Sequence, residues 1–262
     1  MNPKVLILKA DGINCDEELA FAFNLAGGKA ETVHINDLRL RKKKLSDYQI
    51  LAIPGGFSYG DDVVSGKILA VELTSFLSKE LKKFLKRKNT LVIGICNGFQ
   101  VLVRTGLLPF NHLGEMDATL INNESGHFEC RWIKLKQNSS RCVFLNSSDG
   151  ILTFQVAHGE GKFFANPKVL KDIEKRGLVA FRYIDEKGNP TQKYPDNPNG
   201  SLNAIAGVCD PTGRILGLMP HPERFVLKEQ YPNWRSLNPS ADGRKPQGLS
   251  IFEGMINYVK KN

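Results

Sequence analysis

Short apolar runs alternate with helical patterns through the first hundred residues of this 262-residue chain. The runs predicted to be strands are 4–9, 30–35, 48–54 and 91–95, and the last of them has the composition of a buried strand. Helical patterns fall between them, at 15–25 and at 67–86, and the second predicts one long amphipathic helix. Alternating strands and helices indicate an α/β protein with a mostly parallel, doubly wound sheet and helices on both faces. In such sheets the functional site lies beyond the carboxyl ends of the strands.

The ends of these elements carry their own signals. Asn14 is a good N-cap for the helix at 15–25, and the pair Gly27-Gly28 is suited to close that helix. Residues 37–45 favour a loop or a short helix.

After Leu108 the pattern becomes one of strands and turns. Strands are predicted at 118–122, 127–136, 142–145, 151–157, 178–183, 203–209 and 215–219. Asp149-Gly150 and the segment 210–213 have the composition of tight turns. We therefore expect an antiparallel part that extends the first sheet or packs beside it.

The remaining segments are predicted to be loops and a closing helix. Residues 190–201 are polar and rich in Asn and Pro, which favours a loop. Residues 228–247 are predicted to be an exposed insertion, and 249–260 have a helical pattern. No internal repeat or linker divides the chain, so we expect residues 1–262 to form a single domain.

The composition is that of an ordinary soluble globular protein, with 41% hydrophobic and 24% charged residues. The first nine residues include only four consecutive apolar positions, too few for a signal peptide or a membrane span. Five irregularly spaced cysteines form no disulfide framework, and the chain has no C-x-x-C or H-E-x-x-H pattern. We therefore expect a cytoplasmic protein with no membrane contact, no metal site and no cofactor of its own.

The net charge of +9 is concentrated in two basic runs, 39–44 and 82–88. Such runs raise the possibility of nucleic-acid binding. The first run has no aromatic residues among its basic ones, and the chain has no recognised nucleic-acid module. The sequence therefore favours solvated faces or contact with an acidic partner, and no nucleic acid is expected.

The segment 91–104 predicts a nucleophile elbow. An apolar strand at 91–95 meets a helical pattern at 99–104, and Cys96 stands between Gly94 and Gly98. A sharp turn from strand to helix projects the nucleophile above the sheet, and the glycines relieve crowding there. The helix N-terminus favours a thiolate and a neighbouring oxyanion. Cys96 is therefore the candidate nucleophile.

A thiol nucleophile needs a base, and His221 is the strongest candidate. It lies between two prolines after an apolar strand, and Glu223 follows two residues later. In an extended segment, positions i and i+2 face the same side, so Glu223 could orient the imidazole. This predicts a Cys96–His221–Glu223 triad. The alternative is a rigid proline-rich turn with a surface histidine.

Two other residues compete for these roles. His158 ends a predicted strand and could be the base with Glu160 as its carboxylate, could line a ligand pocket, or could cap a turn. Cys15 stands at a predicted helix start and is a rival nucleophile. The three acidic residues at 16–18 disfavour a thiolate there.

The glycine-rich loop 54–62 is a candidate oxyanion site. It follows a predicted strand but lacks the Lys and Ser/Thr spacing of a phosphate-binding loop. Gly55 and Gly56 would allow a backbone N–H to approach an oxyanion closely. The N–H groups of Gly56 and Asn97 would then form a two-donor oxyanion hole. The alternative is a tight loop with no ligand.

With these motifs together, the sequence resembles the class I (triad) glutamine amidotransferases and, within them, the glutaminase subunits of de novo purine synthesis. The residues that carry the resemblance are Pro54-Gly-Gly-Phe-Ser-Tyr-Gly-Asp-Asp62, Gly94-Ile-Cys-Asn-Gly-Phe-Gln100, Asn123-Glu-Ser-Gly-His-Phe-Glu-Cys-Arg-Trp132, Ala157-His-Gly-Glu-Gly161, Tyr194-Pro-Asp-Asn-Pro-Asn-Gly-Ser201 and Met219-Pro-His-Pro-Glu-Arg224. The elbow and the His-Pro-Glu segment are common to the class, whereas the motifs at 123–132 and 194–201 resemble the purine enzymes. The resemblance implies a flavodoxin-like fold with an antiparallel extension.

The resemblance also implies the chemistry and the partners. Cys96 would attack glutamine and form a γ-glutamyl thioester, with release of ammonia and then of glutamate. The glutamine pocket would include Gly55, Phe57, Gln100, His158 and Gly159. A synthetase subunit, with ATP and Mg on that chain, would use the ammonia to amidate formylglycinamide ribonucleotide. A small accessory subunit is a further candidate partner, and low activity is expected until the synthetase docks.

Other functions remain open at this point. The same fold could serve a stand-alone γ-glutamyl hydrolase or amidase, which would need no synthetase. A non-catalytic relative of the fold is a third reading, against which the intact Cys96, His221 and Glu223 argue. Residues 228–247 form a longer segment than compact bacterial members would have, and the run 39–44 matches no motif of the family.

Overall fold

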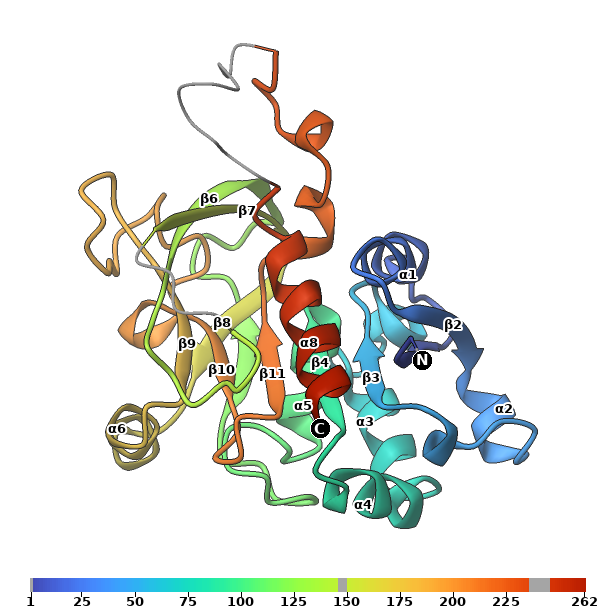
Figure 1. The fold of residues 1–262 in the computed structure, drawn as a ribbon. Coiled ribbons are helices and arrows are strands. Elements are labelled where there is room, and N and C mark those ends of the chain that lie inside the picture. Colours follow the sequence, from blue (N-terminus) through green and yellow to red (C-terminus); the bar gives the residue numbers. More distant parts are fainter. Residues whose placement is uncertain (1, 146–149, 236–245) are drawn as a thin grey trace.

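The computed structural model describes residues 2–145, 150–235 and 246–262. Its strands are β1 (Lys4–Lys9), β2 (Lys29–His34), β3 (Ile50–Ile53), β4 (Leu91–Ile95), β5 (Thr119–Asn122), β6 (Glu129–Gln137), β7 (Ile151–His158), β8 (Glu160–Phe164), β9 (Val179–Tyr183), β10 (Ile205–Cys209) and β11 (Ile215–Leu218). The described residues form a nine-stranded sheet in the order β2-β1-β3-β4-β11-β10-β9-β6-β7, with β5 and β8 paired separately (Figure 1).

The sheet has a parallel half and an antiparallel half. The β1–β2, β1–β3, β3–β4 and β4–β11 pairs are parallel. The β11–β10, β10–β9, β9–β6 and β6–β7 pairs are antiparallel. The predicted parallel sheet with an antiparallel extension is therefore confirmed, and the β5–β8 pair packs beside it.

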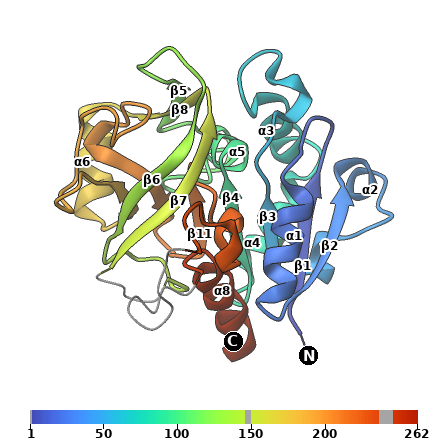
Figure 2. The same ribbon diagram turned by 90° about the horizontal axis from the view of Figure 1, so that it is seen from above.

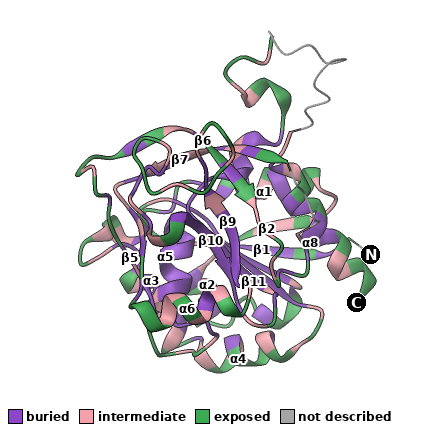
Figure 3. Ribbon diagram, turned by 90° about the vertical axis from the view of Figure 1, so that its left-hand side faces the viewer, coloured by how far each residue is buried: buried purple, intermediate pink, exposed green. Residues whose placement is uncertain are grey.

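Helices cover both faces of the parallel half. The described helices are α1 (Asp16–Leu25), α2 (Ile35–Arg39), α3 (Lys67–Thr74), α4 (Ser78–Lys86), α5 (Asn97–Arg104), α6 (Pro167–Lys175) and α8 (Leu249–Lys261), of which α6 lies beside the antiparallel half. In the view from above, α1 and α8 lie together on one face, while α3 and α5 lie on the other (Figure 2). One hydrophobic cluster fills the space between the sheet and these helices, and the buried interior is continuous in Figure 3.

The central strands are buried along their whole length. Every residue of β3, β4 and β11 is buried. Short, continuous apolar runs are the pattern expected of parallel strands covered on both faces, which is why these strands could be recognised from the sequence. Because β4 pairs in parallel with β3 and β11, the loops that follow the three strands emerge side by side at one edge.

The prediction of one continuous helix over 67–86 is wrong. It is two helices, α3 and α4, separated at Ser75. The Thr74 and Ser75 hydroxyls donate hydrogen bonds to the carbonyl oxygens of Ala70 and Val71, the kind of side-chain competition that bends or ends a helix. Apolar periodicity alone did not detect this break.

Other local predictions also need correction. Residues 142–145 form no strand; Cys142 and Phe144 are buried, and the Val143 N–H donates to the Gly213 carbonyl oxygen in the hairpin turn. Asn14 is not the N-cap of α1, because Cys15 occupies that position. The predicted turn at Asp149-Gly150 extends outside the described residues.

Two elements were missed, β8 and α6. The start of α6 has a recognisable signal, since Asn166 accepts a hydrogen bond from the Val169 N–H and Pro167 follows at the first helical position. The strand β8 is short and begins next to a glycine, so its pattern is weak.

The two basic runs meet on one surface. Lys44 from the first run and Lys83 and Arg87 from the second line a common hollow. Arg87 donates hydrogen bonds to the Ser46 and Tyr48 carbonyl oxygens, and Lys43 pairs with Glu31, so part of this charge is used within the fold. Among the described helices, none has both the length and the apolar composition needed to cross a membrane.

The elbow should tolerate no side chain at Gly98. A Cβ there would lie 2.0 Å from the Ile53 carbonyl oxygen, which is part of the sheet backbone. We expect Gly98→Ala to lower the free energy of unfolding by about 3 kcal/mol, measured by urea denaturation. Gly159→Ala is the matched control, because its Cβ would meet only the Phe128 ring at 3.8 Å. Equal stability of the two variants would contradict this packing.

Candidate active site

Cys96 lies at the tip of a strained turn between β4 and α5. Its backbone has φ 53° and ψ −109°, a region that non-glycine residues rarely adopt. The Cys96 N–H donates a hydrogen bond of 2.8 Å to the Leu218 carbonyl oxygen at the end of β11. A Cβ on Gly94 would lie 2.4 Å from the Gly98 carbonyl oxygen, so the strand and the helix touch here. This close contact holds the thiol of Cys96 above the sheet.

His221 and Glu223 follow the neighbouring strand β11. The His221 Nδ1 and Glu223 Oε1 atoms are 2.6 Å apart, and each residue is 1% exposed. Glu223 belongs to the 3-10 turn η4 (Pro222–Phe225) rather than to the extended segment that the sequence suggested. The pairing forms through the turn, and His221 Nε2 is left buried without a hydrogen bond to another described residue.

The charges around His221 favour its protonated form. Burial by itself lowers the pKa of His221, but the charges of Glu223 and Cys96 outweigh burial and raise the pKa to about 10. The imidazolium of His221 holds a proton beside the sulfur of Cys96. The arrangement is therefore suited to a nucleophilic sulfur with a proton held ready at His221.

The glycine loop lies directly against this pair. A Cβ on Gly55 would come within 2.8 Å of His221 Cε1 and 3.3 Å of Cys96 Cβ. Gly56 has φ 134°, which a side chain would not tolerate. Among the described residues, the N–H groups of Gly56 and Asn97 donate no hydrogen bond to a protein acceptor. Neither group is engaged by a described residue, which is what the predicted oxyanion hole requires.

The Asn97 side chain ties this loop to the elbow. Its Oδ1 accepts a hydrogen bond from the Ser58 N–H, and its Nδ2 donates to Asp61 and Gln100. Gln100 is buried, and its own Nε2 donates to the Glu160 carbonyl oxygen. Gln100, predicted to line the glutamine pocket, therefore has its amide engaged in joining α5 to the start of β8.

His158 lies next to the triad but in a different electrostatic state. Burial, followed by the charge of His221, lowers the pKa of His158 to about 3. Its Nδ1 donates to Asn123 Oδ1 at 3.1 Å, and its Nε2 accepts from Asn199 Nδ2 at 3.4 Å. Two amides, and not the carboxylate of Glu160, hold this ring. His158 is a neutral histidine in the wall of the site.

Asn123 and Asn199 are site residues to which no role was given from the sequence. Each is fully hydrogen-bonded: Asn123 also accepts from the Gly161 N–H, and Asn199 also donates to the Tyr183 hydroxyl. Both lie in motifs that carried the family resemblance, which was the signal available. They connect the loops at 123–128 and 194–201 to His158.

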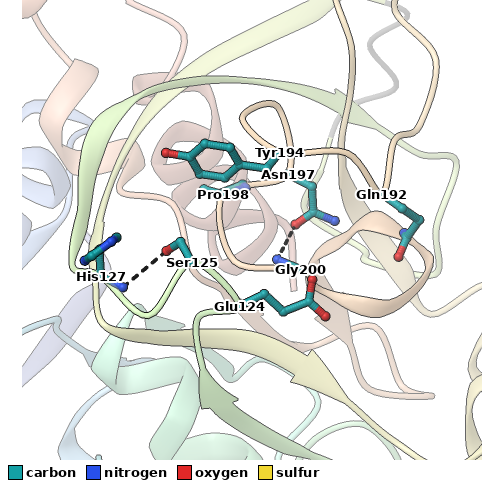
Figure 4. Close-up of a pocket in the computed structure, with 8 residues that line it drawn as sticks. All are labelled: Glu124, Ser125, His127, Gln192, Tyr194, Asn197, Pro198 and Gly200. Atoms are coloured by element: carbon teal, nitrogen blue, oxygen red, sulfur yellow. Dashed lines mark hydrogen bonds between the residues drawn. The ribbon is translucent and has the colours of Figure 1, made fainter.

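An open pocket lies on the outer side of these loops (Figure 4). It has a volume of about 440 Å³ and includes none of the predicted site residues. Its lining residues are Glu124, Ser125, His127, Gln192, Tyr194, Asn197, Pro198 and Gly200. On the side of Gly55–Gly56, Phe57 is 46% exposed and its ring lies 6.3 Å from that of Phe128, near Gly159.

Cys15 lies behind the triad and is not suited to be the nucleophile. Burial, then the charges of Glu223 and Glu18, raise the pKa of the Cys15 thiol far above its ordinary value. Its sulfur accepts a hydrogen bond from Arg224, which also donates to Glu18. Cys15, Glu18, His221 and Glu223 offer potential metal-ligand atoms within 4.8 Å of one another. The Arg224 guanidinium already provides a positive charge at this cluster.

Comparison with known proteins places these motifs in context. Residues 2–259 match the family described as the CobB/CobQ-like glutamine amidotransferase domain. The chain is 46% identical to the phosphoribosylformylglycinamidine synthase subunit PurQ of Methanococcus maripaludis, over 99% of this chain and 98% of that protein. It is 45% identical to the subunit of the same name from Dehalococcoides mccartyi, over 98% of each chain.

The fold is similar to that of a solved structure as well. A chain in the structure of PurLQS from Thermotoga maritima superimposes with a TM-score of 0.73 and 28% sequence identity. The match covers 99% of this chain and 100% of that chain.

The charge on Glu223 should control the titration of His221. In the folded protein the pKa of His221 is raised to about 10. The ion pair of His221 with Glu223 therefore contributes its full stabilisation below the ordinary histidine pKa of about 6.5, and this stabilisation is lost as the pH rises through 10. We expect Glu223→Gln to lower the pKa of His221, measured by NMR titration, and to lower turnover by roughly 10²–10⁴-fold. An unchanged His221 titration would refute the pairing.

His158 should stay neutral where ordinary histidines titrate. Its folded pKa is about 3, so its contribution to stability is present above pH 6.5 or so and is lost as pH falls through 3. We expect the imidazole NMR signals of His158 to show the Nδ1–H tautomer without titration between pH 5 and 8. A midpoint near pH 6.5 would show that the ring is solvated.

Proposed function

This chain belongs to the CobB/CobQ-like glutamine amidotransferase family, and we propose that it is the glutaminase subunit of a phosphoribosylformylglycinamidine synthase. The observation that carries the proposal is the convergence of Cys96, the His221–Glu223 pair and Gly55–Gly56 after three neighbouring strands. A nucleophile, an oriented base and free N–H donors are what amide hydrolysis through a thioester requires.

The reaction begins when the Cys96 thiolate attacks the side-chain carbonyl carbon of glutamine. The new C–S bond leaves negative charge on the carbonyl oxygen, which the N–H groups of Gly56 and Asn97 stabilise. His221 then gives its proton to the departing nitrogen from Nε2, while Glu223 holds Nδ1 at 2.6 Å. Breakage of the C–N bond releases ammonia and leaves a γ-glutamyl thioester on Cys96.

Water completes the cycle. His221, now neutral, takes a proton from a water molecule that attacks the thioester carbonyl carbon. The same two N–H groups stabilise the second oxyanion. The C–S bond then breaks, glutamate leaves, and the thiolate of Cys96 and the imidazolium of His221 are restored.

The ammonia passes to a synthetase partner that amidates formylglycinamide ribonucleotide. We place ATP and its metal ion on that partner, because the glycine-rich loop of this chain lies against Cys96 and has no phosphate-binding spacing. The solved PurLQS structure contains a chain similar to this one, which supports such a complex. A cytoplasmic location is part of the proposal and is supported by five cysteines that are all free.

Replacement of the nucleophile tests the proposal. We expect Cys96→Ala to lose ammonia release from glutamine by at least about 10³-fold, because no other thiol is placed to form the thioester. After incubation with diazo-oxo-norleucine, mass spectrometry of the parent protein should show a covalent adduct on Cys96 alone. Ammonia release by the parent should rise when the synthetase is present. Cys130→Ala is the control, since that exposed thiol lies outside the site. Equal ammonia release by the Cys96→Ala protein would sink the mechanism.

A further inference from the structure

The start of the segment 228–247 packs onto the catalytic turn. Tyr231 stacks on Phe225, with ring centroids 5.4 Å apart, and meets the edge of Trp132 at 5.2 Å. Trp132 in turn meets Phe225 edge-on at 5.6 Å. Aromatic pairs of this geometry stabilise the fold by more than the burial of their apolar surface alone would. Phe225 is the last residue of η4, the turn that contains Glu223.

A hydrogen-bonded cap strengthens this contact. The Gln230 Oε1 accepts from the N–H groups of Val226 and Leu227, at 2.7 and 2.8 Å. These are the first two residues after η4, so their N–H groups would otherwise lack a partner from the turn. One side chain from the segment thus fixes the exit of the catalytic turn.

The far end of the segment returns to the same place. The Gly248 N–H donates to the Phe225 carbonyl oxygen at 2.9 Å, and a Cβ on Gly248 would lie 1.8 Å from the Pro222 carbonyl oxygen. Gln247 Oε1 accepts from the Thr153 N–H in β7 at 2.7 Å. The start of the segment therefore contacts η4 directly, while at its far end Gln247 binds β7 and the next residue, Gly248, contacts η4.

The gripped elements are those that place the catalytic histidine. The His221 N–H donates to the Gln155 carbonyl oxygen of β7 at 2.8 Å, and Gln155 pairs across the strands with Trp132. Trp132 thus connects the aromatic contact of Tyr231 to the strand that holds His221. Neither Tyr231 nor Gln230 is part of the Cys96 site itself.

We infer that the two ends of the segment 228–247 act as a clamp on η4, with Tyr231 and Gln230 as positioning residues for His221 and Glu223. The clamp keeps the imidazole and the carboxylate in the geometry that proton transfer needs, where a misplacement of about 1 Å costs on the order of 100-fold in rate. The inference deepens the proposed function, on which its activity readout rests.

Four variants test the clamp in the full-length chain. Tyr231→Ala removes the aromatic contact and Gln230→Ala removes the cap acceptor. Tyr231→Phe keeps the ring and Gln230→Glu keeps an oxygen acceptor, so each is a conservative rescue. Trp234→Ala is the matched control, because Trp234 lies in the same segment and its ring contacts the Arg235 guanidinium.

The expected result separates positioning from simple stability. Tyr231→Ala and Gln230→Ala should lower kcat for ammonia release by about 10- to 100-fold with KM for glutamine within about twofold. The pH profile of Cys96 alkylation by iodoacetamide and the NMR titration of His221 should both shift. Tyr231→Phe, Gln230→Glu and Trp234→Ala should match the parent in all three measurements.

Two outcomes would overturn the inference. One is a lower melting temperature for Tyr231→Ala with kcat, the alkylation profile and the His221 titration unchanged, which would make the contact merely structural. The other is an equal loss in Trp234→Ala. If the parent released no ammonia even with the synthetase present, the proposed function would fail, whereas the alkylation and NMR readouts would still decide on the clamp.

Discussion

Parallel pairing of β4 with both of its neighbours is the constraint on which the site depends. Hydrogen bonds in register place the carboxyl ends of β3, β4 and β11 at one edge. Each strand is then followed at once by a different chemical group: the glycine loop, the thiol, or the histidine with its carboxylate. Gly55 and His221 are more than 150 positions apart in the sequence. They come into contact because the parallel pairing brings the loops after β3 and β11 to the same edge of the sheet.

Two buried histidines in this site have opposite charge states, and their neighbours explain why. Burial disfavours the charged form of both. The carboxylate of Glu223 overcomes this cost at His221, whereas the ring of His158 is hydrogen-bonded by the neutral amides of Asn123 and Asn199. The exchangeable proton therefore resides on the imidazole of His221, and the neighbouring imidazole of His158 stays neutral.

Elements with strong local signals were predictable. The continuous apolar runs identified the parallel strands, and the glycines around Cys96 identified the elbow. The apolar pattern failed at two places. The break between α3 and α4 coincides with hydrogen bonds from the hydroxyls of Thr74 and Ser75 to the preceding turn, and the segment 142–145 buries Cys142 and Phe144 without forming a strand. In both cases an apolar pattern showed burial but not the backbone path.

The sequence by itself determined the candidate nucleophile, the His-Pro-Glu segment, the glycine loop and the family, because each motif is a local arrangement of residue types with its own chemistry. The tertiary structure alone decided the charge state of His158, the engaged amide of Gln100 and the contact of Tyr231 with the catalytic turn. These depend on distances between residues far apart in the chain, and such distances are set by strand order and packing rather than by any local pattern.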